Sequence, residues 1–198
     1  YDLVGNLLSM ENPVGGKTTY QYDKLNRLTQ QFNPDGGIET FSFDVTGNLI
    51  KKTDAEGGLW TYGYDAIGRN TQSVDPLNRT IKHTYDLAGN LSSVLDAAGG
   101  ETTFKYDLLA RITEQKNAEN EVWKYQYNKV GHLLKTTDPL GYETTYEYDA
   151  EGNLLSEKDP LQHENTYSYD EIGRPVQHTD AKGYNTKWKY DKAGNMIE

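Results

Sequence analysis

The sequence predicts an all-β fold made of tandem β-hairpins, and three observations carry this prediction. An aromatic residue followed by Asp or Asn recurs every 21 residues. Each interval holds two four-residue turn motifs, and the runs between them have the usual length of β-strands. Within these runs aromatic and polar residues alternate, as they do in a strand with one half-buried face. The expected product is a curled or spiralling antiparallel sheet that is shell-like or tube-like.

The repeat has a constant length along the whole chain. Its opening dipeptide recurs without any insertion, and Asn128 is the only replacement of its Asp. We therefore predict a single repeat array over residues 1–198 that ends in a partial repeat at 190–198. Neighbouring repeats must stabilise one another, because a single hairpin buries too little apolar surface to fold alone. The nine full repeats begin at residues 1, 22, 43, 64, 85, 106, 127, 148 and 169.

Two turns per repeat follow from its motifs, with positions counted from the opening aromatic residue. Positions 2 to 5 read Asp-x-x-Gly, and positions 12 to 15 read Asp-Pro-x-Gly or a near variant. The Asp side chain accepts hydrogen bonds from backbone amides, Pro presets φ, and Gly supplies the positive φ that closes a type I turn with a bulge. The predicted turn residues are Asp2, Gly5, Asp23, Gly47, Asp65, Gly68, Asp75, Pro76, Asp86, Gly89, Asp138, Pro139, Gly141, Asp149, Gly152, Asp159, Pro160, Asp170, Gly173, Asp191 and Gly194.

The second strand of each repeat predicts an aromatic ladder. Positions 18 and 20 and position 1 of the next repeat share one face, while the polar positions 19 and 21 point to the other. Position 20 is aromatic in every full repeat except where His83 occupies it. The predicted ladder consists of Tyr1, Tyr20, Tyr22, Phe41, Phe43, Tyr62, Tyr64, Tyr85, Phe104, Tyr106, Tyr125, Tyr127, Tyr146, Tyr148, Tyr167, Tyr169, Trp188 and Tyr190.

Position 6 indicates a longer period of two repeats. Its side chain alternates between Asn and Arg over the first six repeats, and the alternation slips at His132. Two roles are open for this position, since it can form hydrogen bonds between neighbouring turns or, as Arg, stack on the tyrosines. The alternating residues are Asn6, Arg27, Asn48, Arg69, Asn90 and Arg111.

Composition argues against several classes of partner. The chain has 30 acidic and 20 basic side chains and a formal net charge of −10, which disfavours nucleic acid and anionic membrane surfaces. No apolar run approaches 18 residues, so membrane insertion is not expected, and the first residues do not resemble a signal peptide. The absence of cysteine removes disulfide and thiolate chemistry. Because the chain starts at a repeat boundary, we expect a segment of a longer protein.

No catalytic, cofactor or metal site is predicted. Gly15-Gly16-Lys17-Thr18 resembles the end of a phosphate-binding loop, but Glu11 stands where the loop requires Gly, so a turn is the better interpretation. The Asp residues are spaced ten or eleven apart without a calcium-loop cluster, which favours turn capping. The histidines occupy four different repeat positions and are not expected to converge on a metal: His83, His132, His163 and His178.

These motifs together resemble the YD repeat of the Rhs family. The repeat that runs from Tyr148-Asp149-Ala150-Glu151-Gly152-Asn153-Leu154-Leu155 to Asp159-Pro160-Leu161 matches it closely, and the resemblance covers the full chain. The family includes Rhs polymorphic toxins, the B and C components of insecticidal toxin complexes, wall-associated proteins and teneurins. The resemblance implies a β-sheet that spirals into a hollow shell. In the toxins such a shell encloses a C-terminal cytotoxic domain, and teneurins use theirs in adhesion.

One motif of the Rhs toxins has only a partial counterpart. Their self-cleavage site follows an Asp-Pro-x-Gly-Leu pattern, whereas Asp138-Pro139-Leu140-Gly141 is followed by Tyr142 and lies in repeat register. We interpret this segment as a turn. No residue outside the repeat pattern forms a catalytic constellation, so the chain is predicted to be non-enzymatic.

Three functions are compatible with this sequence. The first is a structural segment of an Rhs-like shell, secreted or at a bacterial cell surface and delivered by a secretion system, whose partner is the rest of a longer polypeptide or an enclosed toxin domain. The second is a self-assembling extracellular fibre or tube, since exposed terminal strands can add further strands. The third is a carbohydrate-binding adhesion module in which tyrosines stack on glycans.

Overall fold

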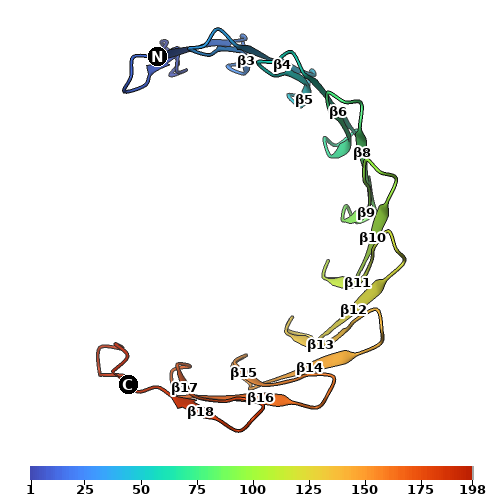
Figure 1. The fold of residues 1–198 in the computed structure, drawn as a ribbon, viewed down its shortest axis with the longest axis vertical. Coiled ribbons are helices and arrows are strands. Elements are labelled where there is room, and N and C mark those ends of the chain that lie inside the picture. Colours follow the sequence, from blue (N-terminus) through green and yellow to red (C-terminus); the bar gives the residue numbers. More distant parts are fainter. Residues whose placement is uncertain (198) are drawn as a thin grey trace. The chain divides into compact units, whose positions relative to one another are not determined.

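The computed structural model describes residues 1–197, and over this range it contains eighteen strands and no helix. Among the described residues there is accordingly no helix that could span a membrane. The chain divides into two compact units, Tyr1–Glu101 and Thr102–Glu198 (Figure 1). The prediction of an all-β fold built from tandem hairpins is confirmed.

In the first unit, consecutive strands pair antiparallel from β1 to β9. Most strands have five or six residues, because turn residues interrupt the chain about every ten residues. The strands are β1 (Ser9–Glu11), β2 (Lys17–Tyr22), β3 (Leu28–Phe32), β4 (Ile38–Phe43), β5 (Leu49–Thr53), β6 (Leu59–Tyr64), β7 (Asn70–Val74), β8 (Thr80–Tyr85) and β9 (Leu91–Leu95).

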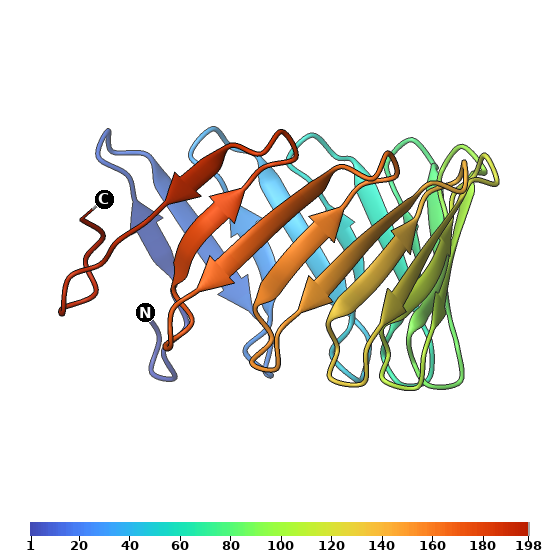
Figure 2. The ribbon, with the colours of Figure 1, turned by 90° about the horizontal axis from the view of Figure 1, so that it is seen from below.

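The second unit repeats this arrangement from β10 to β18, and Figure 2 shows the strands side by side with turns at both ends of the strands. Tyr190 and Met196 form an isolated bridge after the last strand. The strands are β10 (Glu101–Tyr106), β11 (Ile112–Lys116), β12 (Val122–Tyr127), β13 (Leu133–Thr137), β14 (Glu143–Tyr148), β15 (Leu154–Lys158), β16 (Glu164–Tyr169), β17 (Pro175–Thr179) and β18 (Asn185–Lys187).

The two turns of a repeat close in the same way, but only the hairpin around the first turn contains a register shift. In the first turn of the third repeat, the Asp44 amide donates to the Asn48 carbonyl at 2.9 Å and the Gly47 amide donates to the Asp44 carbonyl at 3.2 Å. Next to this turn, the register between β4 and β5 shifts between Ser42 and Phe43, so that Phe43 pairs with Leu49. The pairs that flank the second turn run without a shift.

The last residue of each four-residue turn has a positive φ, whatever its side chain. Gly does so at most of these positions, for example Gly47 at +99° and Gly141 at +85°. The residues that replace Gly adopt the same conformation, including Ala110 at +59° and Gln162 at +67°. Strand pairing therefore imposes the left-handed conformation even on residues with a Cβ, which disfavours it.

Replacing Ala110 by Gly is expected to stabilise the protein. The native φ of +59° costs Ala roughly 1 kcal/mol that Gly does not incur, and this gain exceeds the extra flexibility of Gly in the unfolded chain. Chemical denaturation followed by circular dichroism should show a higher midpoint. A lower midpoint would mean that the Ala110 turn is not strained.

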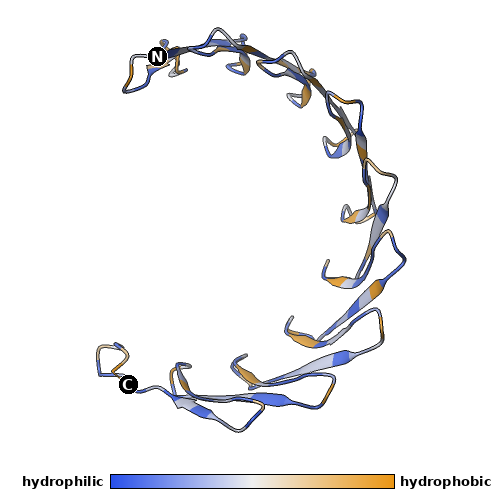
Figure 3. Cartoon of the chain, in the orientation of Figure 1, coloured by the Kyte–Doolittle hydropathy of each residue, from blue (hydrophilic) through white to orange (hydrophobic). Residues whose placement is uncertain are grey.

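Each unit is a single layer of sheet without a hydrophobic core. No hydrophobic residue in the described part of the chain is buried, and the only buried polar residues there are Ser93 and Ser156. Figure 3 shows apolar and hydrophilic segments interspersed along the strands. Stability must therefore come from pairing and packing between neighbouring repeats, as in other repeat proteins.

Candidate functional site

The first turn of each repeat is organised by the carboxylate at position 2. Asp44 Oδ1 accepts hydrogen bonds from the backbone amides of Thr46 and Asn48, each at 2.9 Å, and its Oδ2 accepts one from Asn48 Nδ2 at 2.9 Å. Hydrogen bonds from the side chains of Thr46 and Asn48 lower the pKa of Asp44 to about 2. The predicted turn Asp residues thus act inside their own turns.

Arg at position 6 links two successive turns. Arg27 Nε donates to Asp23 Oδ2 of its own turn at 2.7 Å, and its Nη1 donates to the carbonyl of Asp44 in the next turn at 3.0 Å. Its guanidinium carbon also lies 4.8 Å from the centre of the Phe43 ring. The two roles that the sequence left open, hydrogen bonding and stacking, are performed by the same side chain.

The same stacking recurs at the other arginines of this position. Arg111 donates to the Asn128 carbonyl at 2.8 Å and lies 4.8 Å from the Tyr127 ring centre. The corresponding distances to the ring centre are 4.3 Å for Arg69 over Tyr85 and 4.4 Å for Arg174 over Tyr190. Contacts of this kind stabilise by about 0.5–1 kcal/mol at partly exposed sites.

His132 takes the place of Arg or Asn where the alternation slips. Its ring lies 4.7 Å from that of Tyr148, tilted by 30°. Its Nδ1 lies 3.3 Å from Asn128 Nδ2, and Asn128 is also the residue that replaces Asp at position 2. The two departures from the repeat pattern therefore fall on one contacting pair.

The tyrosine at position 1 ties neighbouring strands together through its hydroxyl group. Tyr64 Oη donates to the Leu49 carbonyl, 15 residues earlier, at 2.9 Å, and burial raises the pKa of Tyr64. A hydroxyl paired in this way keeps a half-buried polar group satisfied. Bonds between the same two repeat positions join Tyr22 to Leu7, Tyr85 to Asn70, Tyr169 to Leu154 and Tyr190 to Pro175.

The ladder residues are half-buried, except that Tyr1 is 83% exposed, and all but Tyr1, Trp188 and Tyr190 lie in strands. The face they share is not uniformly aromatic, because the register places position 10 directly opposite position 20, as in the pair Phe41 and Lys52. Lys52 Nζ lies 5.7 Å from the Phe41 ring centre and 2.9 Å from Glu39 Oε2. The sequence pattern did not place these polar side chains among the aromatic residues.

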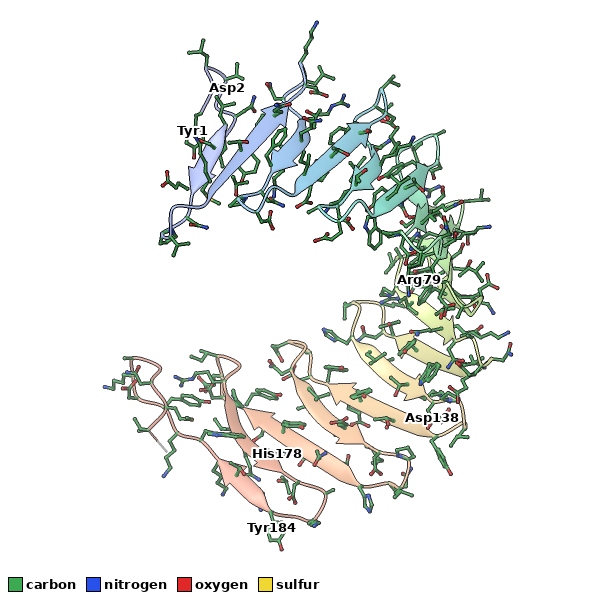
Figure 4. The ribbon with its side chains drawn as sticks, turned by 45° about the horizontal axis from the view of Figure 1, so that its top comes forward. Tyr1, Asp2, Arg79, Asp138, His178 and Tyr184 are labelled. Carbon is green, nitrogen blue, oxygen red and sulfur yellow. The ribbon has the colours of Figure 1, made fainter. Side chains whose placement is uncertain are left out.

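A histidine occupies position 10 near the C-terminus. The His178 ring stacks on Tyr167 at 4.9 Å with an interplanar angle of 14°. Figure 4 shows His178 and the side chains that project from the strands. His178 Nε2 is buried at this position without a hydrogen-bond partner.

The other histidines are not gathered at one place. His83 Nδ1 lies 3.1 Å from Asn70 Oδ1, and His163 Nδ1 lies 2.9 Å from Asp159 Oδ2. Over residues 1–197 no three His, Asp or Glu side chains are arranged to hold a metal ion. In the Asp-Pro-Leu-Gly segment, Asp138 Oδ1 accepts hydrogen bonds from the backbone amides of Leu140 and Tyr142 at 2.9 and 2.8 Å. This is the arrangement of an ordinary second turn of the repeat.

The geometry defines a class of protein: a tandem β-hairpin repeat protein in which contacts between the first turns of successive repeats recur at one end of the strands. The RHS Repeat family model matches the chain five times, and the matches together cover nearly all of it: 1–38, 43–80, 85–122, 127–164 and 166–198. The chain therefore belongs to the Rhs repeat family, as the resemblance of its motifs predicted.

Two solved structures that resemble the chain come from toxin complexes. They are the crystal structure of TcdB2-TccC3-TEV and the structure of a Tc holotoxin pore of Photorhabdus luminescens with a TccC3 mutation. Each alignment covers 99% of this chain and 15% of the other, with a TM-score of 0.55 and 17% sequence identity. At this identity the likeness shows a shared fold. No curated protein matches the sequence.

Proposed function

We propose that this chain is a non-catalytic wall segment of an Rhs-type shell that encloses or presents another domain, such as a toxin or effector. Its partners are then the rest of a longer polypeptide and the enclosed domain, and its setting is extracellular or at a bacterial cell surface. Membership of the Rhs repeat family supports this proposal. So does the likeness in fold to chains of Tc toxin complexes, of whose length this chain spans about 15%.

The absence of buried hydrophobic residues in residues 1–197 carries the proposal. A globular domain of this length would bury about 70% of the surface its unfolded chain exposes and would hold a core. Here the half-buried aromatic residues lie on a single layer, and tight turns join consecutive strands at both ends of the strands. A layer that is stabilised by its neighbours along the chain is suited to form a wall. Its 21-residue spacing continues across both units, which supports one continuous array.

Electron microscopy of the purified protein tests this proposal, together with light scattering over a wide range of concentrations. A wall segment is expected to give discrete particles whose mass does not grow with concentration. Long filaments of uniform width would contradict it and favour a self-assembling fibre, in which terminal strands add to one another. Selective binding on a glycan array would instead favour a carbohydrate-binding module.

A further inference from the structure

The side chain at position 6 decides how strongly two successive first turns are joined. Where it is Arg, it reaches the next turn through the stacked guanidinium, as Arg69 does over Tyr85. Where it is Asn, its amide is used within its own turn. Asn48 Nδ2 donates to Asp44 Oδ2 and to Thr46 Oγ1, each at 2.9 Å.

Two further positions show the same rule and its one exception. Asn153 Nδ2 donates to Asp149 Oδ2 of its own turn at 2.9 Å. Asn6 Nδ2 reaches the next turn at 3.0 Å, because Asn26 occupies the position that Gly usually takes there and offers its Oδ1. The short Asn side chain thus crosses to the next turn only when that turn supplies a partner.

Backbone pairing does not distinguish the two kinds of junction. The turns at 44–47 and 65–68 are separated by the pair β5 and β6, with three opposed residue pairs that start at Lys51 and Thr61. The turns at 65–68 and 86–89 are separated by β7 and β8, which also have three opposed pairs. The difference between these junctions therefore lies in the position-6 side chain.

We propose that within each unit the contact between successive first turns is strong at the Arg junctions and weak at the Asn junctions. Side chains at the Arg junctions hold successive first turns together: Arg27, Arg69, Arg111 and Arg174. At the Asn junctions, Asn48 and Asn153, successive first turns separate first. This inference goes beyond the proposed wall function and does not depend on it. It predicts that the row of first turns opens at defined junctions rather than evenly along the unit.

The burial of the arginines supports the contrast between junctions. The linking arginines are well covered, with side-chain exposure of 24% for Arg111 and 30% for Arg69, and covered cation–π contacts are stronger than exposed ones.

Hydrogen exchange read by mass spectrometry on the intact chain tests the proposal. Arg69→Gln is expected to raise the exchange rate of the amides at 86–90 about fivefold, because the link to that turn is lost. The matched control is Arg79→Gln, which removes the same charge. Arg79 is 61% exposed and its Nε pairs with Asp75 of its own turn at 2.6 Å. This control should leave exchange at 86–90 unchanged.

The reverse substitution makes the test independent of destabilisation. Asn48→Arg places a guanidinium where Tyr64 and the Asp65 carbonyl are the next aromatic ring and acceptor, so exchange at 65–69 should slow. The proposal is overturned if Asn48→Arg does not slow exchange there. It is also overturned if Arg69→Gln changes 86–90 no more than Arg79→Gln does, or speeds exchange equally throughout the first unit.

Discussion

Replacing Gly152 by Val is expected to destabilise the protein by roughly 2–4 kcal/mol. Gly152 has a φ of +93°, which a β-branched residue adopts only under strain. A Cβ at this position would also lie 2.8 Å from two atoms of the His132 ring, so that ring would have to leave its place beside Tyr148. Thermal denaturation followed by circular dichroism should show a melting temperature lower by several degrees.

Two further glycines separate the causes of this effect. Gly173→Val should cost less, about 1–2 kcal/mol, because φ is +80° but the nearest atom to an added Cβ is Asn153 Oδ1 at 3.6 Å. Gly63→Val is the matched control, since Gly63 lies in β6 without a positive φ and an added Cβ meets Gln72 at an ordinary 3.5 Å. It should be neutral or stabilising, because Val favours strands. An unchanged melting temperature for Gly152→Val and Gly173→Val would show that the turn conformation is wrong.

Replacing Tyr64 by Ala is expected to cost about 2–3 kcal/mol, less than for a fully buried aromatic residue. The substitution removes a half-buried ring from the ladder together with the hydrogen bond from Tyr64 Oη to the Leu49 carbonyl. Since the unit has no buried hydrophobic residue, each ring carries a large share of its packing. The free energy of unfolding from urea denaturation measures the loss.

Two companion variants identify its origin. Tyr64→Phe keeps the ring and removes only the hydroxyl group, so it should cost about 1 kcal/mol. Tyr184→Ala removes a tyrosine that is 71% exposed and outside the ladder, so it should leave stability nearly unchanged. If Tyr184→Ala destabilised as much as Tyr64→Ala, the ladder would have no special role in holding neighbouring repeats together.

Much of the local structure could be predicted from single residues. The turn at Asp138-Pro139-Leu140-Gly141 was expected from its composition, and the structure has a turn with Gly141 at positive φ there. The role of the arginines at position 6 could not be decided in the same way. Arg27 touches Asp23 within its turn and Phe43 in the next repeat, and only the spatial distance between the repeats brings these partners within reach of one side chain.

The 21-residue spacing, with its turn residues and alternating strands, was sufficient to establish the all-β class and the Rhs repeat family. The class follows from local backbone preferences that recur in each repeat, and the family follows from the repeated motif itself. The composition of the aromatic face depended on tertiary structure. A bulge beside Phe43 shifts the pairing of β4 and β5, and this shift sets Lys52 opposite Phe41. Register is a relation between two strands, so side-chain alternation within one strand cannot determine it.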